Sequence, residues 1–187
     1  VEAGSAVVRS ERPDIQLGVT TTFSGYEKRT FDRLNAKVDV VFLTYYPLDE
    51  TMGVLPPNSP IADFQKMIGW TSKPIVLQEV GYPAAELIGS SDAKQAEFFQ
   101  NVFRASETHG KRIALLNVFL LVDFSTQVLD TFEKYYWIDH PRFRAFLASL
   151  GLKRKDGTPR PAFGVVKAAI ENRSKGSLRS ERGLGPS

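Results

Sequence analysis

A carboxylate follows a strongly apolar segment near the middle of the chain. In the stretch KPIVLQEVGYPA, residues 73–84, the apolar run 75–77 has the length and composition of a strand buried on both faces. Glu79 follows this run closely, and a Gly-Tyr-Pro breaker ends the segment. A carboxylate in such a place is costly to desolvate. Glu79 therefore needs either a structural partner, such as a salt bridge or a loop cap, or a functional use.

Two tyrosines end the apolar segment that precedes Glu79 in the sequence. Tyr45 and Tyr46 stand just before Pro47, and alternation along a strand directs them to opposite faces. We expect Tyr46 to point inward, where its phenol can donate a hydrogen bond to Glu79. Ordinary aromatic packing under a loop is the alternative for both rings. Asp49 and Glu50 follow in a loop and are expected to be solvated.

A third group of candidates belongs to the apolar segment 112–124. Asn117 and Phe119 share a strand face and could line a sugar site, with Phe119 as a stacking platform. Asp123 ends the same segment. Core packing of Phe119 and a loop cap by Asp123 are the structural alternatives.

Strand–helix alternation must position these residues. The helix-like segments carry apolar residues three or four apart, and the strand-like segments are short apolar runs. Regular alternation along the third strand places Ile75, Leu77 and Glu79 on one face. The predicted strands are 15–23, 38–47, 73–83 and 112–124, and the predicted helices are the end of one over 1–12, then 26–37, 61–70, 92–109, 140–150 and one that begins near Pro161.

Four such alternations predict an α/β fold of parallel strands with right-handed crossovers. An open doubly wound sheet and four βα units forming the C-terminal half of a (β/α)8 TIM barrel both fit this pattern. The sequence contains no dinucleotide, P-loop or nucleophile-elbow motif, and their absence weakens the open-sheet interpretation. In either architecture, chemistry gathers at the carboxyl ends of the strands, where the candidates above stand.

Composition excludes several classes of function. The chain has 187 residues, 42% of them hydrophobic, and a formal net charge of +3. It has no cysteine, so disulfides, thiolate metal sites and a cysteine nucleophile are excluded. Two isolated histidines, His109 and His140, do not make a zinc site, and we predict no metal and no cofactor. No basic face with interleaved aromatics and no membrane-length apolar run is visible, so neither nucleic acid nor a membrane is predicted as a partner.

Three stretches together resemble the C-terminal half of clan A glycoside hydrolases. They are VDVVFLTYYPLD, KPIVLQEVGYP and LGLKRKDGTPRPAF, and the resemblance covers roughly residues 5–172. It is nearest to the endo-β-1,4-galactanase-like and related endo-glycanase families. In these families the seventh strand carries a P-[IV]-x-[ILV]-[ST]-E-x-G pattern, the strand before it ends in aromatic–Tyr–Pro, and a G-x-P-[KR]-P-A turn leads to the last helix.

The resemblance implies a retaining hydrolase of a β-linked oligo- or polysaccharide. Carried over by position, it implies Glu79 as the nucleophile, Tyr46 as its hydrogen-bond partner, and Asn117 and Phe119 as sugar contacts. Gln78 stands where these families usually have a small hydroxyl residue, and Phe119 where they often have tryptophan. We count Tyr45, Gln78 and Asp123 with the substrate-binding candidates.

The same resemblance implies an incomplete active site. The acid/base glutamate of this clan follows an asparagine at the end of strand four, and the chain contains no Asn–Glu pair. We therefore expect residues 1–172 to be a half-barrel with little or no activity alone, and residues 173–187 to be a basic, disordered tail. The open sheet edge of this half-barrel should be covered by an N-terminal half or by a second copy of the chain.

A non-catalytic sugar-binding or scaffold half-barrel is the alternative to the enzyme. A Schiff-base aldolase is disfavoured because Lys73 begins its strand instead of ending it.

Overall fold

The protein folds as a single parallel sheet covered by helices on one side. The computed structural model describes residues 2–182, with side chains described over 3–173. Four strands pair in the order in which they occur in the sequence: β1 (Thr20–Thr22), β2 (Val41–Tyr45), β3 (Ile75–Val80) and β4 (Ile113–Val118). A doubly wound sheet would reverse its strand order at a switch point, whereas this sheet proceeds in one direction, as a barrel does. The predicted α/β half-barrel is confirmed.

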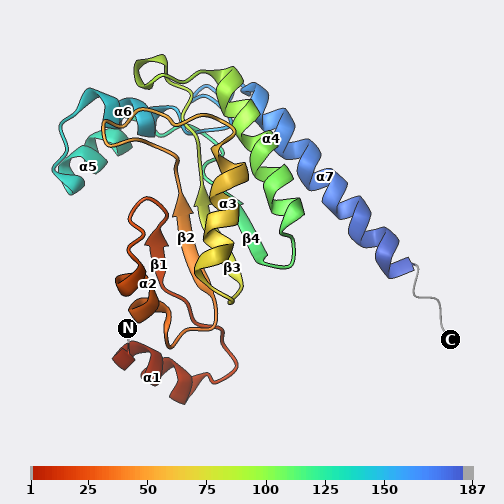
Figure 1. Ribbon diagram of the computed structural model, residues 1–187. Helices are drawn as coiled ribbons and strands as arrows, with labels where there is room; N and C mark the ends of the chain where they lie inside the picture. The colour runs from red at the N-terminus through yellow and green to blue at the C-terminus, as the bar shows by residue number, and fades with distance from the viewer. Residues whose placement is uncertain (1, 183–187) are drawn as a thin grey trace.

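The helices follow the strands and form an outer layer. In Figure 1, α3, α4 and α7 cover the same face of the sheet, and α5 and α6 lie at the end toward which the strands point. Contacts between α4 and both α3 and α7 hold this layer together. The helices are α1 (Glu2–Glu11), α2 (Lys28–Asn35), α3 (Ser59–Trp70), the 3-10 turn η1 (Glu86–Ile88), α4 (Asp92–Thr108), α5 (Thr126–Tyr136), α6 (Pro141–Ala148) and α7 (Pro161–Arg182).

The main core lies between the sheet and the helices. Apolar residues at alternate positions of β2 and β3 point toward α3 and α4, and the rings of Phe64 and Phe98 pack against Tyr45 in edge and stacked arrangements. This core is closed to water. Its fully buried members include Val41, Leu43, Tyr45, Phe64, Met67, Ile75, Leu77, Val80, Tyr82, Phe98, Phe99 and Val102.

A bulge in β3 changes the face of Glu79. Leu43 pairs with Leu77, but Thr44 pairs with Glu79, so Gln78 is an extra residue. Leu77 and Val80 are buried in the helix-side core, whereas Gln78 is exposed and Glu79 is half-buried. Two consecutive side chains therefore leave the core side together, as a β-bulge permits. The prediction that Glu79 shares a face with Ile75 and Leu77 was wrong, because it assumed regular alternation.

The face of the sheet opposite the helices is open. It carries Phe42, Val76 and the half-exposed Leu115, and it borders a hollow of about 670 Å³. In a closed barrel, this face would be the packed interior. Within residues 2–182, no helix covers it (Figure 1). The chain thus presents half of a barrel core to solvent.

Two helical segments were not predicted. Residues 126–136, which had no predicted element, form α5, capped by the Ser125 hydroxyl that accepts a hydrogen bond from the Val128 amide. The helix that begins at Pro161 continues to Arg182 and so includes residues 173–182 of the predicted tail. The rest of the predicted tail, 183–187, lies outside the described residues. None of the helices in the described part of the chain combines the length and apolar character needed to cross a bilayer.

Candidate active site

Glu79 lies at the carboxyl end of β3 and accepts a hydrogen bond from a tyrosine. The Tyr46 Oη donates to Glu79 Oε2 over 2.7 Å, from the residue that follows β2. The two residues are adjacent because β2 and β3 are neighbours and their carboxyl ends meet at one edge of the sheet. The predicted pairing of Tyr46 with Glu79 is present in the structure.

Close packing fixes the Tyr46 ring. A Cβ added at Gly81 would come within 2.6 Å of the Tyr46 Cε1 and 2.7 Å of the Phe119 carbonyl oxygen, so only glycine fits there. The ring also meets Phe146 and Phe119 edge-on, with centroids 5.3 and 6.3 Å away. Its hydroxyl is therefore aimed by its surroundings, and the Glu-Val-Gly sequence of β3 supplies both the acid and the space for its donor.

The electrostatic setting keeps this phenol protonated. Burial, followed by the hydrogen bond to the Glu79 carboxylate, raises the pKa of Tyr46 far above its ordinary value. A neutral phenol can donate to the carboxylate throughout the physiological pH range. One oxygen of Glu79 is thus held in place while the other remains available.

A cleft lined by Tyr46 opens at the carboxyl ends of β1 and β2, and Glu79 is connected to it through the hydrogen bond from Tyr46. The cleft has a volume of about 960 Å³, which is large enough for a sugar unit, and Tyr46, Phe23 and Phe146 contribute aromatic walls. The loop that carries Asp49 and Glu50 forms its rim. An aromatic cleft with a few polar groups next to an oriented carboxylate can hold a carbohydrate.

The loop carboxylates differ in their suitability as a proton donor. Asp49 Oδ1 accepts hydrogen bonds from the Thr51 hydroxyl and from the Thr51 and Gly53 amides, each over 2.8 Å. The Thr51 hydroxyl, together with those amides, lowers the pKa of Asp49. A general acid requires the opposite shift, so Asp49 serves as a turn cap. Glu50 is exposed on the rim, as the sequence predicted.

Tyr45 does not belong to the site. It is fully buried on the helix side, and its hydroxyl donates to Asp63 Oδ2 over 2.8 Å. Burial, followed by the charge of Asp63, raises its pKa. A residue with no exposed surface cannot contact a substrate. The prediction of Tyr45 as a substrate-binding residue was therefore wrong, and aromatic packing, the alternative considered from the sequence, describes it.

Asp123 is a structural residue. Its Oδ2 accepts from Arg160 Nη2 over 2.7 Å, and its Oδ1 accepts from Arg160 Nη1 and the Gly151 amide over 3.0 and 2.8 Å. Both side chains are almost fully buried. Because this ion pair occupies both carboxylate oxygens, the predicted contact of Asp123 with a substrate is contradicted. Asp123 instead anchors the turn after α6 to the chain beyond β4.

Gln78 and Asn117 lie together on the open face. The Asn117 side-chain amide donates to the Gln78 carbonyl over 2.9 Å, and the Thr20 hydroxyl donates to Gln78 Oε1 over 2.5 Å. The Asn117 bond satisfies a bulge carbonyl that the β-ladder leaves free. Both side chains are exposed and border the hollow of the open face, next to Glu79 in the sequence of β3.

Arg160 and the aromatic end of α5 were not among the predicted residues. The KDGTPRP stretch that contains Arg160 was interpreted as a turn before the last helix, and the charge of Arg160 gave no sign of burial. In STQVLDTFEKYYW, Leu129, Phe132 and Tyr136 recur at helical spacing after a serine cap, a signal that predicts α5. Within the described residues, no cluster of three His, Asp or Glu could hold a metal ion.

Several solved structures with the same fold are glycoside hydrolases. The β-D-glucuronidase of Dictyoglomus thermophilum aligns with a TM-score of 0.64 and 15% identity over 90% of this chain. The GH2 β-galacturonidase of Eisenbergiella tayi aligns with a TM-score of 0.63 and 14% identity over 91%. Xylanase 10B of Thermotoga maritima aligns with a TM-score of 0.60 and 16% identity over 92%. A scan against protein-family models finds no match, and neither does a search of curated protein sequences.

These likenesses establish the fold. The neighbours are TIM-barrel glycosidases, and the chain spans 28% and 29% of the two uronidases and 52% of the xylanase. The sheet is therefore of the TIM-barrel type, which is the fold that the resemblance in the sequence implied. The nearer likeness to endo-galactanases stays a prediction.

Proposed function

We propose that this chain is the nucleophile-bearing half of a retaining glycoside hydrolase that acts on a β-linked glycan. The observation that carries the proposal is the hydrogen bond from Tyr46 to Glu79 at the carboxyl edge of a glycosidase-type sheet. In the proposed reaction, a Glu79 carboxylate oxygen forms a bond to the anomeric carbon as the bond to the leaving oxygen breaks. Water later releases the sugar from the ester.

We propose that the described part of the chain supplies only one of the two carboxyl groups that this reaction needs. A retaining mechanism uses a second carboxyl about 5–5.5 Å away to protonate the leaving oxygen. Asp49 caps a turn and Asp123 is paired with Arg160, so neither is available for this task. We propose that the acid belongs to a complementary half-barrel, and that the chain alone hydrolyses natural glycans slowly or not at all.

A sugar with an activated leaving group separates the first step from the missing acid. Dinitrophenolate departs without protonation, so a 2,4-dinitrophenyl 2-deoxy-2-fluoro-β-glycoside should transfer its sugar to Glu79 and stay attached. We expect a mass increase of one fluorosugar, located by peptide mass spectrometry on the peptide containing Glu79. Xyloside, glucuronide and galacturonide versions cover the sugar types of the structural neighbours, and a galactoside version covers that of the resemblance.

Absence of label with all four sugars, even when a complementary half-barrel is supplied, would contradict the enzymatic proposal. Label on another carboxylate would contradict the assignment of Glu79. The alternative function, a non-catalytic sugar-binding half-barrel, is favoured by one observation: Asp49 and Asp123, two candidates for the acid, are both engaged elsewhere. Sugar binding without label would support it.

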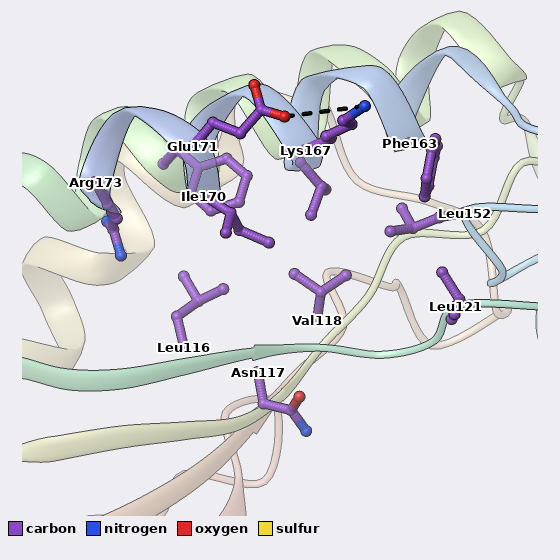
Figure 2. A pocket seen from close by; sticks show the side chains of 12 residues that line it. Leu116, Asn117, Val118, Leu121, Leu152, Phe163, Lys167, Ile170, Glu171 and Arg173 are labelled. Atoms are coloured by element: carbon purple, nitrogen blue, oxygen red, sulfur yellow. Dashed lines mark ion pairs between the residues drawn. The ribbon is translucent and has the colours of Figure 1, made fainter. Parts of the chain in front are cut away.

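The open edge of β4 supports a proposal about the partner. Figure 2 shows Leu116 and Val118 pointing toward Phe163, Lys167 and Ile170 of α7, while Asn117 points to the other side of the strand. The groove between them has a volume of about 580 Å³ and a largely apolar lining. Exposed apolar residues also occur in and after α1, which lies at the end of the sheet where the strands begin (Figure 1): Val7, Val8 and Ile15. The edge of β4 therefore offers an apolar groove that a second half-barrel would bury.

For the chain alone, we propose a second copy as that half-barrel. As the concentration of the isolated chain increases, its measured molecular mass should rise from the 20.8 kDa of a monomer toward twice that value. Ile170→Lys, in the groove and 58% exposed, should weaken self-association about tenfold or more, because it would bury an unpaired charge. The matched control is Leu87→Lys. Leu87 lies on η1, outside the groove, and is 59% exposed, so this variant should show the same increase of mass with concentration as the parent. A chain that stays monomeric at all concentrations would contradict the proposal. If the dimer dissociates when an N-terminal half-barrel is added, the chain prefers that half-barrel to a second copy of itself.

A further inference from the structure

Trp137 combines two unfavourable features. Its side chain is 93% exposed, although tryptophan has a large apolar surface. Its backbone is left-handed, with φ 57° and ψ 34°, at the residue that ends α5. Glycine is the usual residue in this conformation, and a bulky residue there is uncommon. Nothing in the local backbone favours tryptophan, because the turn is closed by amide hydrogen bonds from Trp137 and Ile138 to the Glu133 carbonyl.

The end of α5 adjoins the site of Glu79 through α6. Tyr136 packs edge-on against Phe143, and Tyr46 packs edge-on against Phe146, one helical turn further along α6. The ring of Tyr136 is half-exposed, and Tyr136 contributes to the raised pKa of Tyr46. Figure 1 places α5 and α6 beyond the carboxyl ends of the strands, the end at which β3 carries Glu79. Trp137 is the chain neighbour of Tyr136, which α6 connects to Tyr46 through Phe143 and Phe146.

Polar groups surround the indole. Trp137 borders a hollow of about 700 Å³ together with Asp130, Glu133, Lys134 and Asp139. Arg144 forms ion pairs with Asp130 and Glu133, which holds these carboxylates in place. An exposed aromatic face next to fixed carboxylates matches a pyranose ring, whose C–H face is apolar and whose edge carries hydroxyl donors. A protein partner would cover such a ring with apolar surface and would leave these charges unpaired.

We propose that Trp137 is the stacking platform of a distal sugar subsite, separated by α6 from the cleft that Tyr46 and Phe146 line. The occupant is a pyranose unit of a glycan chain that extends from the cleft across the end of α5. The identity of the occupant as a sugar rests on the proposed function. The strained backbone then has a purpose, because it turns the indole away from the helix and toward the chain of sugars.

The chain has two tryptophans, Trp70 and Trp137, which makes the subsite observable by fluorescence. Trp70 stacks on Tyr26 at a centroid distance of 3.7 Å and packs against Phe23, so the solvent-exposed emission belongs to Trp137. Titration with xylohexaose, cellohexaose and β-1,4-galactohexaose should shift this emission to the blue and protect it from acrylamide in at least one case. Trp137→Gly should abolish the response and weaken binding of that hexaose about tenfold or more by calorimetry.

The Trp137→Gly variant also distinguishes binding from folding. Glycine adopts the left-handed conformation without strain, so the melting temperature should stay the same or rise. Trp137→Phe should retain most of the affinity, and the control Leu87→Ala, an exposed apolar residue on η1, should retain all of it.

Covalent labelling of Glu79 by the one-sugar fluoroglycoside separates this proposal from the proposed function. Lost hexaose binding with unchanged labelling in Trp137→Gly supports both proposals. Equal hexaose binding by Trp137→Gly and the parent overturns the subsite, whatever the labelling. Trp137-dependent binding without label supports the subsite and contradicts the enzyme. If none of the three hexaoses changes the Trp137 emission, the subsite is overturned.

Discussion

The Glu79→Gln variant is expected to acquire no covalent sugar from the dinitrophenyl fluoroglycosides under conditions that label the parent fully. An amide lacks the charged oxygen that must attack the anomeric carbon, and removing a nucleophile typically lowers a rate by about 10⁴-fold or more. The fold should be kept, because the glutamine carbonyl can still accept the hydrogen bond from Tyr46. Intact-protein mass spectrometry over time measures the effect, and thermal melting checks the fold.

The matched control for this substitution is Glu50→Gln. Glu50 is an exposed carboxylate on the rim of the same cleft, and its loss should leave the labelling rate with an activated leaving group within a factor of about two. Labelling that persists in Glu79→Gln, or that disappears in Glu50→Gln instead, would show that the nucleophile has been assigned to the wrong carboxylate.

The Arg160→Met variant is expected to lose about 3–5 kcal/mol of unfolding free energy, the usual cost of breaking a buried ion pair from one side. Arg160 donates to Asp123 twice, to Asp92 and to the Gly151 carbonyl, and its side chain is only 7% exposed. Its removal leaves the buried Asp123 carboxylate without a counter-ion. For a domain of this size, the melting temperature should fall by roughly 10 °C.

Arg154→Met is the control for this effect. Arg154 pairs with the same Asp92, but its side chain is 42% exposed and therefore well solvated. Surface pairs of this kind contribute about 1 kcal/mol or less. Chemical denaturation of both variants gives the comparison. If both variants lose the same free energy of unfolding, burial of the Asp123–Arg160 pair does not determine how much this pair stabilises the fold.

The sequence was sufficient for the architecture and for the central pair of the site. Apolar runs separated by helical patterns predicted four parallel strands, and the strand-end rule placed Tyr46 beside Glu79. Both predictions depend on features that a sequence carries directly, namely apolar periodicity and the position at which each run ends. Strand alternation also holds at Asn117, which points away from the side of its neighbours Leu116 and Val118, as Figure 2 shows.

The remaining residues depended on contacts between distant parts of the chain. Asp123 was misassigned because its partner, Arg160, is 37 residues away and carried no sign of burial. Tyr45 was misassigned because alternation could not decide which of two adjacent tyrosines would have a buried acceptor such as Asp63. The face of Glu79 depended on a bulge, which regular alternation cannot anticipate. Helix α5 was predictable from its serine cap, but the exposure of Trp137 was not.

The extra residue in β3 affects how this protein should be compared with its relatives. Without Gln78, the strand would alternate regularly, and Glu79 and Val80 would keep their opposite faces. The families that the sequence resembles have a residue at this position too, usually a small hydroxyl residue, so we expect their strands to carry the same extra residue. An alignment should therefore keep position 78 without a gap, and a relative that lacks this residue should also lack the bulge.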